Sequence, residues 1–148
     1  MGAREEQLVQ RFLAAWGDGR TERPDVDAIA AALADDVTWQ LWMPGGPTLR
    51  GRDAVVADIE RQLVFATHMC CGVQRMTSHG STVITERLDT FRSGSVTVQH
   101  SLCAVFDLDA DGKIAAWREY FDVRDLDRQL KAANATVPRV DGKRGGAG

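Results

Sequence analysis

Apolar residues recur at helical spacing in the first half of the chain. This pattern predicts one helix over residues 5–16, a second helix that opens at Pro24, and a longer third helix over residues 52–71. Between the second and third helices, residues 37–43 are predicted to form a strand. The Pro-Gly-Gly-Pro sequence at residues 44–47 that follows it predicts a turn.

The second half of the chain alternates between apolar and polar residues, which is typical of β-strands. Four such runs are predicted as strands: residues 73–79, 82–91, 95–107 and 113–121. Short turns separate them, so successive strands are expected to pair antiparallel. A short helix is predicted over residues 123–132, and residues 133–148, which are rich in glycine, are predicted to form a mobile tail.

Helices followed by an antiparallel meander predict an α+β fold with the helices on one face of the sheet. The chain has 148 residues, which fits a single domain, expected over residues 1–132. In this fold the N-terminal helices close a curved, mostly antiparallel sheet into a cone. A small ligand is expected in the open mouth of the cone.

Charge and composition narrow the range of partners. The formal net charge is −3 without any basic stripe, so neither nucleic acid nor an anionic membrane is expected as a partner. No long apolar run or signal peptide is found, and three cysteines do not form a convincing disulfide framework; both observations favour the cytoplasm. Residues 68–71 hold a histidine and two cysteines but no second ligand pair, so no metal is expected, and no motif indicates a cofactor.

Three ionisable residues are predicted on apolar faces of two strands. Alternation places Arg87 and Asp89 on the same face, and it places Glu119 between Trp117 and Phe121. Such charges cost several kcal/mol in an apolar environment unless they pair, so Arg87 is predicted to bridge the two carboxylates. The trio is then either an acid/base site or a structural ion network, in which each charge neutralises a neighbour.

His100 is a further candidate, because alternation places it on an otherwise apolar strand face. It is either a core histidine with satisfied hydrogen bonds or a group that offers a hydrogen bond or a proton relay to the pocket. The pocket itself is predicted to be apolar and lined by Trp39, Leu41, Trp42, Phe65, Met69 and Leu102.

Two segments carry a resemblance to a known family. Residues 84–89 (Ile-Thr-Glu-Arg-Leu-Asp) and residues 112–122 (Gly-Lys-Ile-Ala-Ala-Trp-Arg-Glu-Tyr-Phe-Asp) resemble the limonene-1,2-epoxide hydrolases, and the similarity covers most of residues 12–130. This resemblance implies a cone fold like that of nuclear transport factor 2 and ketosteroid isomerase, commonly as a homodimer. It also implies one-step opening of an epoxide without a covalent intermediate, a metal or a cofactor.

The same resemblance implies roles for individual residues. Asp89 matches the general acid that protonates the epoxide oxygen, Arg87 matches the bridging arginine, and Glu119 stands where the family has an aspartate as general base. Trp39 and Leu41 stand where the family has a tyrosine and an asparagine that hold the attacking water. His100 and Leu102 occupy positions at which the family has apolar pocket-lining residues.

The leading hypothesis is therefore hydrolysis of an apolar epoxide, of the terpenoid, lipid-like or polyketide class, to a vicinal diol. Because the water-holding positions are changed, a close alternative is attack by a hydroxyl group of the substrate, which gives a cyclic ether. A second alternative is proton transfer, as in isomerases and polyketide cyclases of the same fold. A third alternative is a binding or dimerisation module without catalysis.

Overall fold

The computed structural model describes residues 2–132, which form four helices and six strands. The helices are α1 (Ala3–Ala14), α2 (Val26–Ala31), α3 (Arg52–Leu63) and α4 (Val123–Ala132). The strands are β1 (Leu33–Met43), β2 (Thr48–Arg50), β3 (His68–His79), β4 (Thr82–Ser93), β5 (Val96–Leu108) and β6 (Ile114–Tyr120). The predicted tail at residues 133–148 lies outside the described residues.

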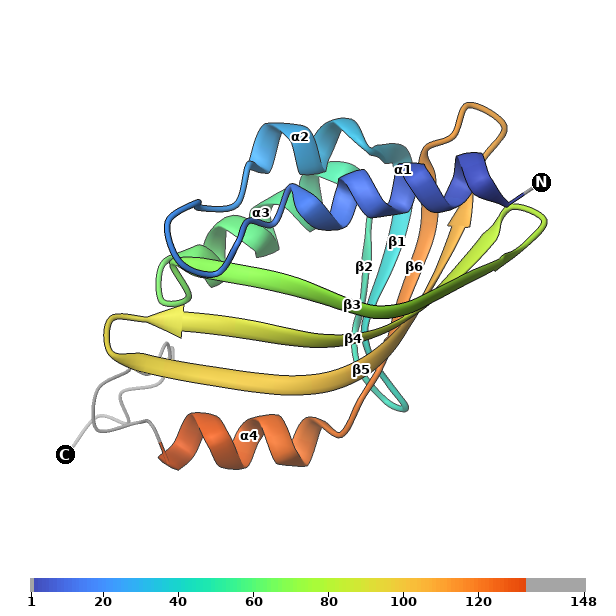
Figure 1. Ribbon diagram of the computed structural model, residues 1–148. Coiled ribbons are helices and arrows are strands. Elements are labelled where there is room, and N and C mark those ends of the chain that lie inside the picture. Colours follow the sequence, from blue (N-terminus) through green and yellow to red (C-terminus); the bar gives the residue numbers. More distant parts are fainter. Residues whose placement is uncertain (1, 133–148) are drawn as a thin grey trace, which may run out of the picture.

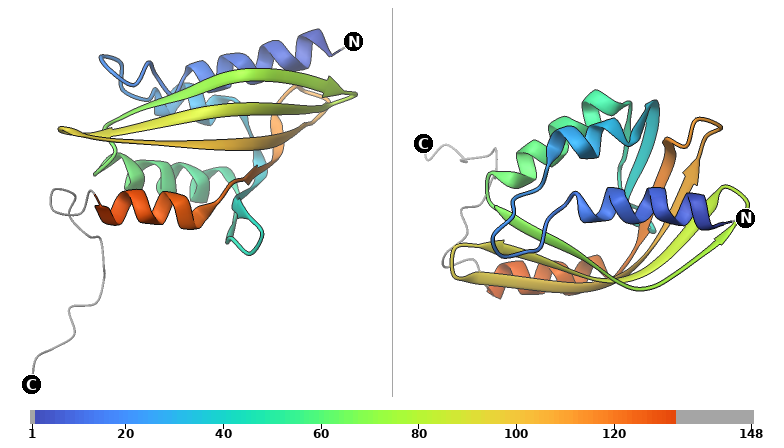
Figure 2. Two further views of the ribbon diagram at one scale, coloured as in Figure 1. Left: turned by 60° about the horizontal axis from the view of Figure 1, so that its bottom comes forward. Right: turned by 45° about the horizontal axis from the view of Figure 1, so that its top comes forward.

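The strands form one sheet in the order β2-β1-β6-β5-β4-β3. Strands β3 to β6 pair antiparallel in chain order, which confirms the predicted meander. At the other side, β1 runs parallel to β6 and antiparallel to β2. Figure 1 shows the resulting strongly curved sheet, with α1, α2 and α3 together on one side and α4 beside β5. The two views in Figure 2 show the same curvature, and the predicted α+β architecture is confirmed.

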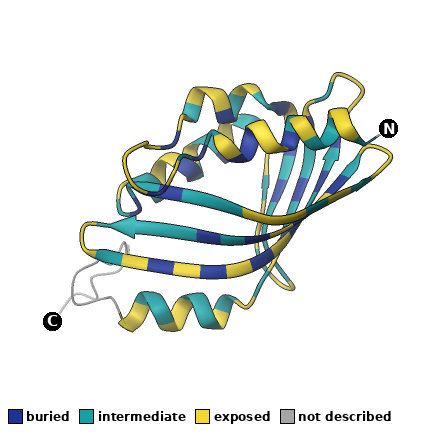
Figure 3. Cartoon of the chain, viewed as in Figure 1, coloured by how far each residue is buried: buried dark blue, intermediate teal, exposed yellow. Residues whose placement is uncertain are grey.

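Alternation along the strands decides which side chains point into the interior of the fold. On β5, every second side chain from Val98 to Phe106 is buried and the residues between them are more exposed, as the banding in Figure 3 shows. The helices add their apolar faces to the same interior. The core is drawn from α1, α2, α3 and the sheet, and includes Val9, Phe12, Ile29, Val37, Val55, Ile59, Val83 and Phe106.

Three predicted boundaries are wrong. The third helix ends at Leu63, and residues 68–71 belong to β3, where His68 pairs with Arg92 of β4. Strand β1 begins at Leu33, four residues earlier than predicted, because its first residues pair with β6. The short strand β2 was not predicted at all. In each case pairing between strands overrides the local pattern, and only the pairing of β1 with β6 joins segments distant in the sequence.

The second helix begins two residues later than predicted. Its first residue is Val26, because the side chain of Asp25 caps the helix: Asp25 Oδ1 accepts a hydrogen bond from the backbone N–H of Ala28 at 3.0 Å. None of the helices in residues 2–132 has the length and apolar character needed to span a membrane.

Candidate active site

The structure brings the three predicted ionisable residues together. Arg87 Nε and Nη2 donate hydrogen bonds to the two carboxylate oxygens of Asp89, at 3.1 and 2.8 Å. The same Nη2 donates a longer hydrogen bond to Glu119 Oε1 at 3.4 Å. Arg87 is 1% exposed, Asp89 5% and Glu119 9%, so the trio is buried. The predicted bridge by Arg87 is therefore present in the fold.

Register explains why these residues meet. Arg87 and Asp89 share a face of β4 because they are two residues apart on a strand. Glu119 comes from β6, on the other side of β5, and its neighbour across the sheet is Ala104. Because Ala104 is small and fully buried, the long Arg87 side chain can cross the space above it to reach Glu119.

The net effect of burial and neighbouring charges is to raise the pKa values of both Glu119 and Arg87. Burial raises the pKa of Glu119 to about 7, and the negative charge of Asp89 adds to this effect, while the Arg87 guanidinium opposes it. Burial disfavours the charged form of Arg87, but its hydrogen bonds and attraction to Asp89 outweigh that cost and raise the pKa of Arg87. Arg87 is thus a permanent cation, and Glu119 keeps a proton up to about neutral pH.

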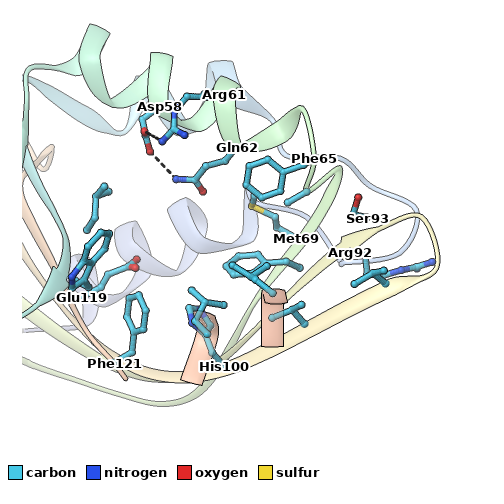
Figure 4. Close-up of a pocket in the computed structure, with 18 of the residues that line it drawn as sticks. Asp58, Arg61, Gln62, Phe65, Met69, Arg92, Ser93, His100, Glu119 and Phe121 are labelled. Atoms are coloured by element: carbon cyan, nitrogen blue, oxygen red, sulfur yellow. Dashed lines mark hydrogen bonds and ion pairs between the residues drawn. The ribbon is translucent and has the colours of Figure 1, made fainter. Parts of the chain in front are cut away.

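Glu119 of the trio lines an apolar cavity of about 250 Å³, which we call the outer cavity. Figure 4 shows Glu119, Phe121 and His100 on one side of it and the α3 residues Asp58, Arg61 and Gln62 on the other. Apolar side chains make up most of its lining: Trp39, Leu41, Trp42, Phe65, Met69, Phe91, Val98, Phe121, Leu126 and Leu130.

A smaller inner cavity of about 50 Å³ lies directly at the trio, and Arg87, Asp89 and Glu119 all line it. Trp16, Trp39 and Trp117 also line this inner cavity, and Trp42 lines the outer one. All four tryptophans of the chain are therefore placed around the site. The rings of Trp39 and Trp117 stack at a centroid distance of 4.1 Å and an interplanar angle of 3°.

The predicted pocket residues of β1 and β5 have different positions. Trp39 lines both cavities, and Leu41 lines the outer one. Leu102 is buried on β5 but lines neither cavity, so its position does not support the substrate contact expected of it.

His100 lies in the wall of both cavities, directly across from Asp89 in the pairing of β4 and β5. Its ring packs between Phe91 and Phe121, at centroid distances of 5.1 and 4.8 Å. Burial lowers the pKa of His100, which favours the neutral imidazole. Its Nδ1 is buried without a hydrogen-bond partner among the described residues, so His100 is not a core histidine with satisfied hydrogen bonds.

Sequence reasoning missed five polar residues that line the outer cavity: Asp58, Arg61 and Gln62 of α3, and Arg92 and Ser93 of β4. Gln62 Nε2 donates a hydrogen bond to Asp58 Oδ2 at 2.7 Å, and Asp58 also accepts one from Arg61. The only signal in the sequence is that Asp58 and Gln62 are four residues apart on a helix. Within residues 2–132, no three histidine, cysteine, aspartate or glutamate side chains are grouped so as to hold a metal ion.

Comparison with known proteins gives a consistent result. The family model described as limonene-1,2-epoxide hydrolase catalytic domain matches residues 3–132. Epoxide hydrolase EphG of Mycobacterium tuberculosis is 34% identical over 109 residues, which cover 74% of this chain and 70% of that protein.

Solved structures agree with this match. An M. tuberculosis protein described as an LEH-like epoxide hydrolase superposes with a TM-score of 0.71 at 31% identity, covering 89% of this chain and 92% of that one. A Shewanella denitrificans protein described as a SnoaL-like polyketide cyclase has a TM-score of 0.74 at 13% identity, covering 88% of this chain and 98% of that one, which shows the fold alone. The resemblance seen in the sequence is confirmed: the chain belongs to the limonene-1,2-epoxide hydrolase family.

Proposed function

We propose that this protein is an epoxide hydrolase that adds water to an apolar epoxide in one step and releases a vicinal diol. The observation that carries the proposal is the buried trio, in which one arginine contacts two carboxyl groups and one of these, Glu119, lines an apolar cavity. Opening an epoxide requires a proton for the leaving oxygen and a base for the attacking water. Two carboxyl groups that share one proton supply both.

The proposed roles follow from the positions of the two carboxyl groups. Glu119 lines both cavities, whereas Asp89 lines only the inner one. We assign Glu119 as the base that takes a proton from water and Asp89 as the acid that protonates the epoxide oxygen. Arg87 stays cationic throughout and balances the single negative charge that the pair carries.

Without substrate, Glu119 holds a proton up to about neutral pH, because burial raises its pKa to about 7. The two shorter hydrogen bonds of Arg87 go to Asp89. Bound substrate and water change this balance. An ionised Glu119 accepts a hydrogen bond from water, and a protonated Asp89 donates one to the epoxide oxygen. Both contacts favour the arrangement in which Asp89 holds the proton, and such redistribution is expected of a tightly coupled pair.

The lining of the outer cavity supports an apolar substrate of the terpenoid, lipid-like or polyketide class. Most of its lining is indole, phenyl and aliphatic; the polar lining residues are Asp58, Arg61 and Gln62 on α3, and Arg92, Ser93, His100 and Glu119 on the sheet. A sugar or a nucleotide would leave many of its polar groups without partners against such walls.

Labelled water tests the proposal and separates it from its alternatives. The protein is incubated with cyclic and linear apolar epoxides in H₂¹⁸O, and the products are analysed by mass spectrometry. Diol with one ¹⁸O atom is the expected result. A cyclic ether without label would instead show attack by a substrate hydroxyl group, which the apolar Leu41 leaves as the nearest alternative. Turnover of carbonyl compounds but of no epoxide would overturn the proposal in favour of a proton-transfer enzyme.

We also propose that two copies of the chain associate through the outer face of the sheet. Ile84 of β4 is 41% exposed and Tyr120 of β6 is 40% exposed. Val105 is the neighbour of Ile84 on β5, and Cys103 is the neighbour of Tyr120, so these side chains form a small apolar area, which Glu86 and Arg118 border. A second copy would cover this area.

A further inference from the structure

We infer that Gln62, together with Trp39 and Glu119, holds the water molecule that attacks the epoxide. The inference rests on the proposed function. It names a hydrogen-bond acceptor for the attacking water, which β1 does not provide because Leu41 has no polar side-chain atom. Gln62 reaches the site from α3, on the opposite side of the cavity from Glu119 (Figure 4).

The orientation of the Gln62 amide is fixed by Asp58. A carboxylate only accepts hydrogen bonds, so the amide nitrogen and not the amide oxygen must face Asp58 Oδ2. Asp58 is itself held by Arg61, which donates to its other oxygen. Gln62 Oε1 is consequently left as a free acceptor, and Figure 4 shows it directed into the cavity.

A matching donor is present at the same place. Trp39, Gln62 and Glu119 each line both the outer and the inner cavity, as do Met69, Phe91 and His100, so they lie where the two cavities adjoin. Trp39 Nε1 is buried and has no hydrogen-bond partner among the described residues. Since a buried N–H group is costly without a partner, this atom points to a polar ligand. The inner cavity, at about 50 Å³, has room for a water molecule, which needs about 10–15 Å³.

These three groups satisfy a nucleophilic water without blocking its reaction. The water donates one hydrogen to Glu119 and the other to Gln62 Oε1, and it accepts a hydrogen bond from Trp39 Nε1. One lone pair remains for the epoxide carbon. As the new C–O bond forms, the epoxide C–O bond breaks, the water proton passes to Glu119, and the Asp89 proton passes to the leaving oxygen. A proton then returns from Glu119 to Asp89.

Replacing Gln62 by Met tests this inference, because methionine has a similar length and no amide oxygen. We expect kcat for hydrolysis to fall about ten- to a hundredfold, because the water loses its orientation, with KM changed less than about threefold. Asp58→Leu frees the amide to rotate and is expected to lower kcat less. The double variant Asp58→Leu/Gln62→Met is expected to be no slower than Gln62→Met alone, since both changes act on one hydrogen-bonded unit.

The matched control is Gln10→Met, the same substitution at an exposed position of α1, which is expected to keep the parent kcat and KM. Thermal unfolding of each variant shows whether it is folded. If Gln62→Met does not fold, Gln62→Asn takes its place. This substitution withdraws the amide oxygen by one methylene group, and the same fall in kcat is expected.

Several outcomes would overturn the inference, and they differ from a failure of the proposed function. A Gln62→Met enzyme with kcat within twofold of the parent would show that the water does not need Gln62. A loss expressed only in KM would make Gln62 a substrate contact. If the losses of kcat in the double variant were additive, Gln62 and Asp58 would act independently and not as one hydrogen-bonded unit. A parent protein that opens no epoxide would overturn the proposed function, and this inference with it.

Discussion

Arg87 is the residue on which the site depends, because within residues 2–132 it alone hydrogen-bonds to both carboxyl groups of the trio. One buried cation neutralises the negative charge of one carboxylate. The second carboxyl group then keeps its proton, which the two acids can share. In the proposed mechanism, that shared proton supplies both the acid and the base at one place.

The pH dependence of the reaction follows from that proton. Burial raises the pKa of Glu119 to about 7, so the pair holds a proton below about pH 7 and loses it above. The reaction needs one protonated and one ionised carboxyl group. We therefore expect kcat/KM to fall as the pH rises through about 7, approaching tenfold per pH unit. A rate profile from pH 5.5 to 9 measures this, with thermal unfolding at each pH as a control. A rate that rises through pH 7 would contradict a one-proton pair.

The separate roles of the two acids can be distinguished with azide, a nucleophile that needs no base. Glu119→Gln removes the proposed base, and we expect it to slow hydrolysis by about 10²- to 10⁴-fold. Added azide should restore ring opening in this variant and give an azido alcohol. Asp89→Asn lacks the proposed acid and should be slow with both water and azide. Restoration by azide in Asp89→Asn but not in Glu119→Gln would reverse the two assignments.

At the scale of single residues, the sequence predicted the trio but not all of the residues that line the cavities around it. Arg87, Asp89 and Glu119 could be placed because strand alternation and pairing are local rules that extend across a meander. Gln62 could not be placed, because its role depends on how α3 crosses the sheet and on a hydrogen bond that turns its amide. Leu102 lies outside the cavities for a similar reason. Alternation predicts on which face of the sheet a side chain lies, but the curvature of the sheet decides which part of that face lines the pocket.

At the scale of elements, the pairing of β3 with β4 holds Asp89 in position. Cys71 lies opposite Asp89, and Gly72 lies opposite Leu88, next to an irregularity between Val73 and Arg75. A Cβ atom at Gly72 would lie only 2.4 Å from the carbonyl oxygen of Leu88. The two strands can come this close only because residue 72 has no side chain.

Gly72→Ala is therefore expected to push β3 and β4 apart and to lower the free energy of unfolding by about 1–3 kcal/mol. Activity should fall as well, because Asp89 follows Leu88 directly. Urea unfolding measures the change in stability. Ser101→Ala is the matched control: Ser101 pairs with Leu88 from the other side, on β5, and is exposed, so we expect a change within about 0.5 kcal/mol. An equally small change in Gly72→Ala would contradict the close-approach argument.

The element boundaries show where sequence patterns stop being informative. Strands β4 and β5 were predicted to within two residues because their alternation is long and their turns are short. The end of α3 was misplaced by eight residues, since residues 64–71 carry apolar side chains that suit either a helix or a strand. Pairing with β4 selects the strand. The parallel contact between β1 and β6 joins segments far apart in the chain, and no local pattern indicates it.

At the scale of the whole molecule, the apolar area around Ile84 and Tyr120 makes a prediction about assembly. Light scattering should give twice the 16.2 kDa mass of the chain. Ile84→Glu places a charge in the proposed interface and should give the mass of a single chain. Val64→Glu is the control, because Val64 is 77% exposed and lies away from this area, between α3 and β3. A single-chain mass for the parent would refute the proposed dimer.

The placement of all four tryptophans around the two cavities has a practical consequence. Indole emission reports the polarity of its surroundings, and here no tryptophan lies elsewhere to dilute the signal. Intrinsic fluorescence should therefore respond to occupancy of the cavities, including occupancy by diols or other compounds that are never converted. The stacked pair Trp39 and Trp117 should add a near-ultraviolet circular dichroism band that is sensitive to its geometry. The chain thus contains its own spectroscopic probe for the affinity of a ligand, independent of any catalytic assay.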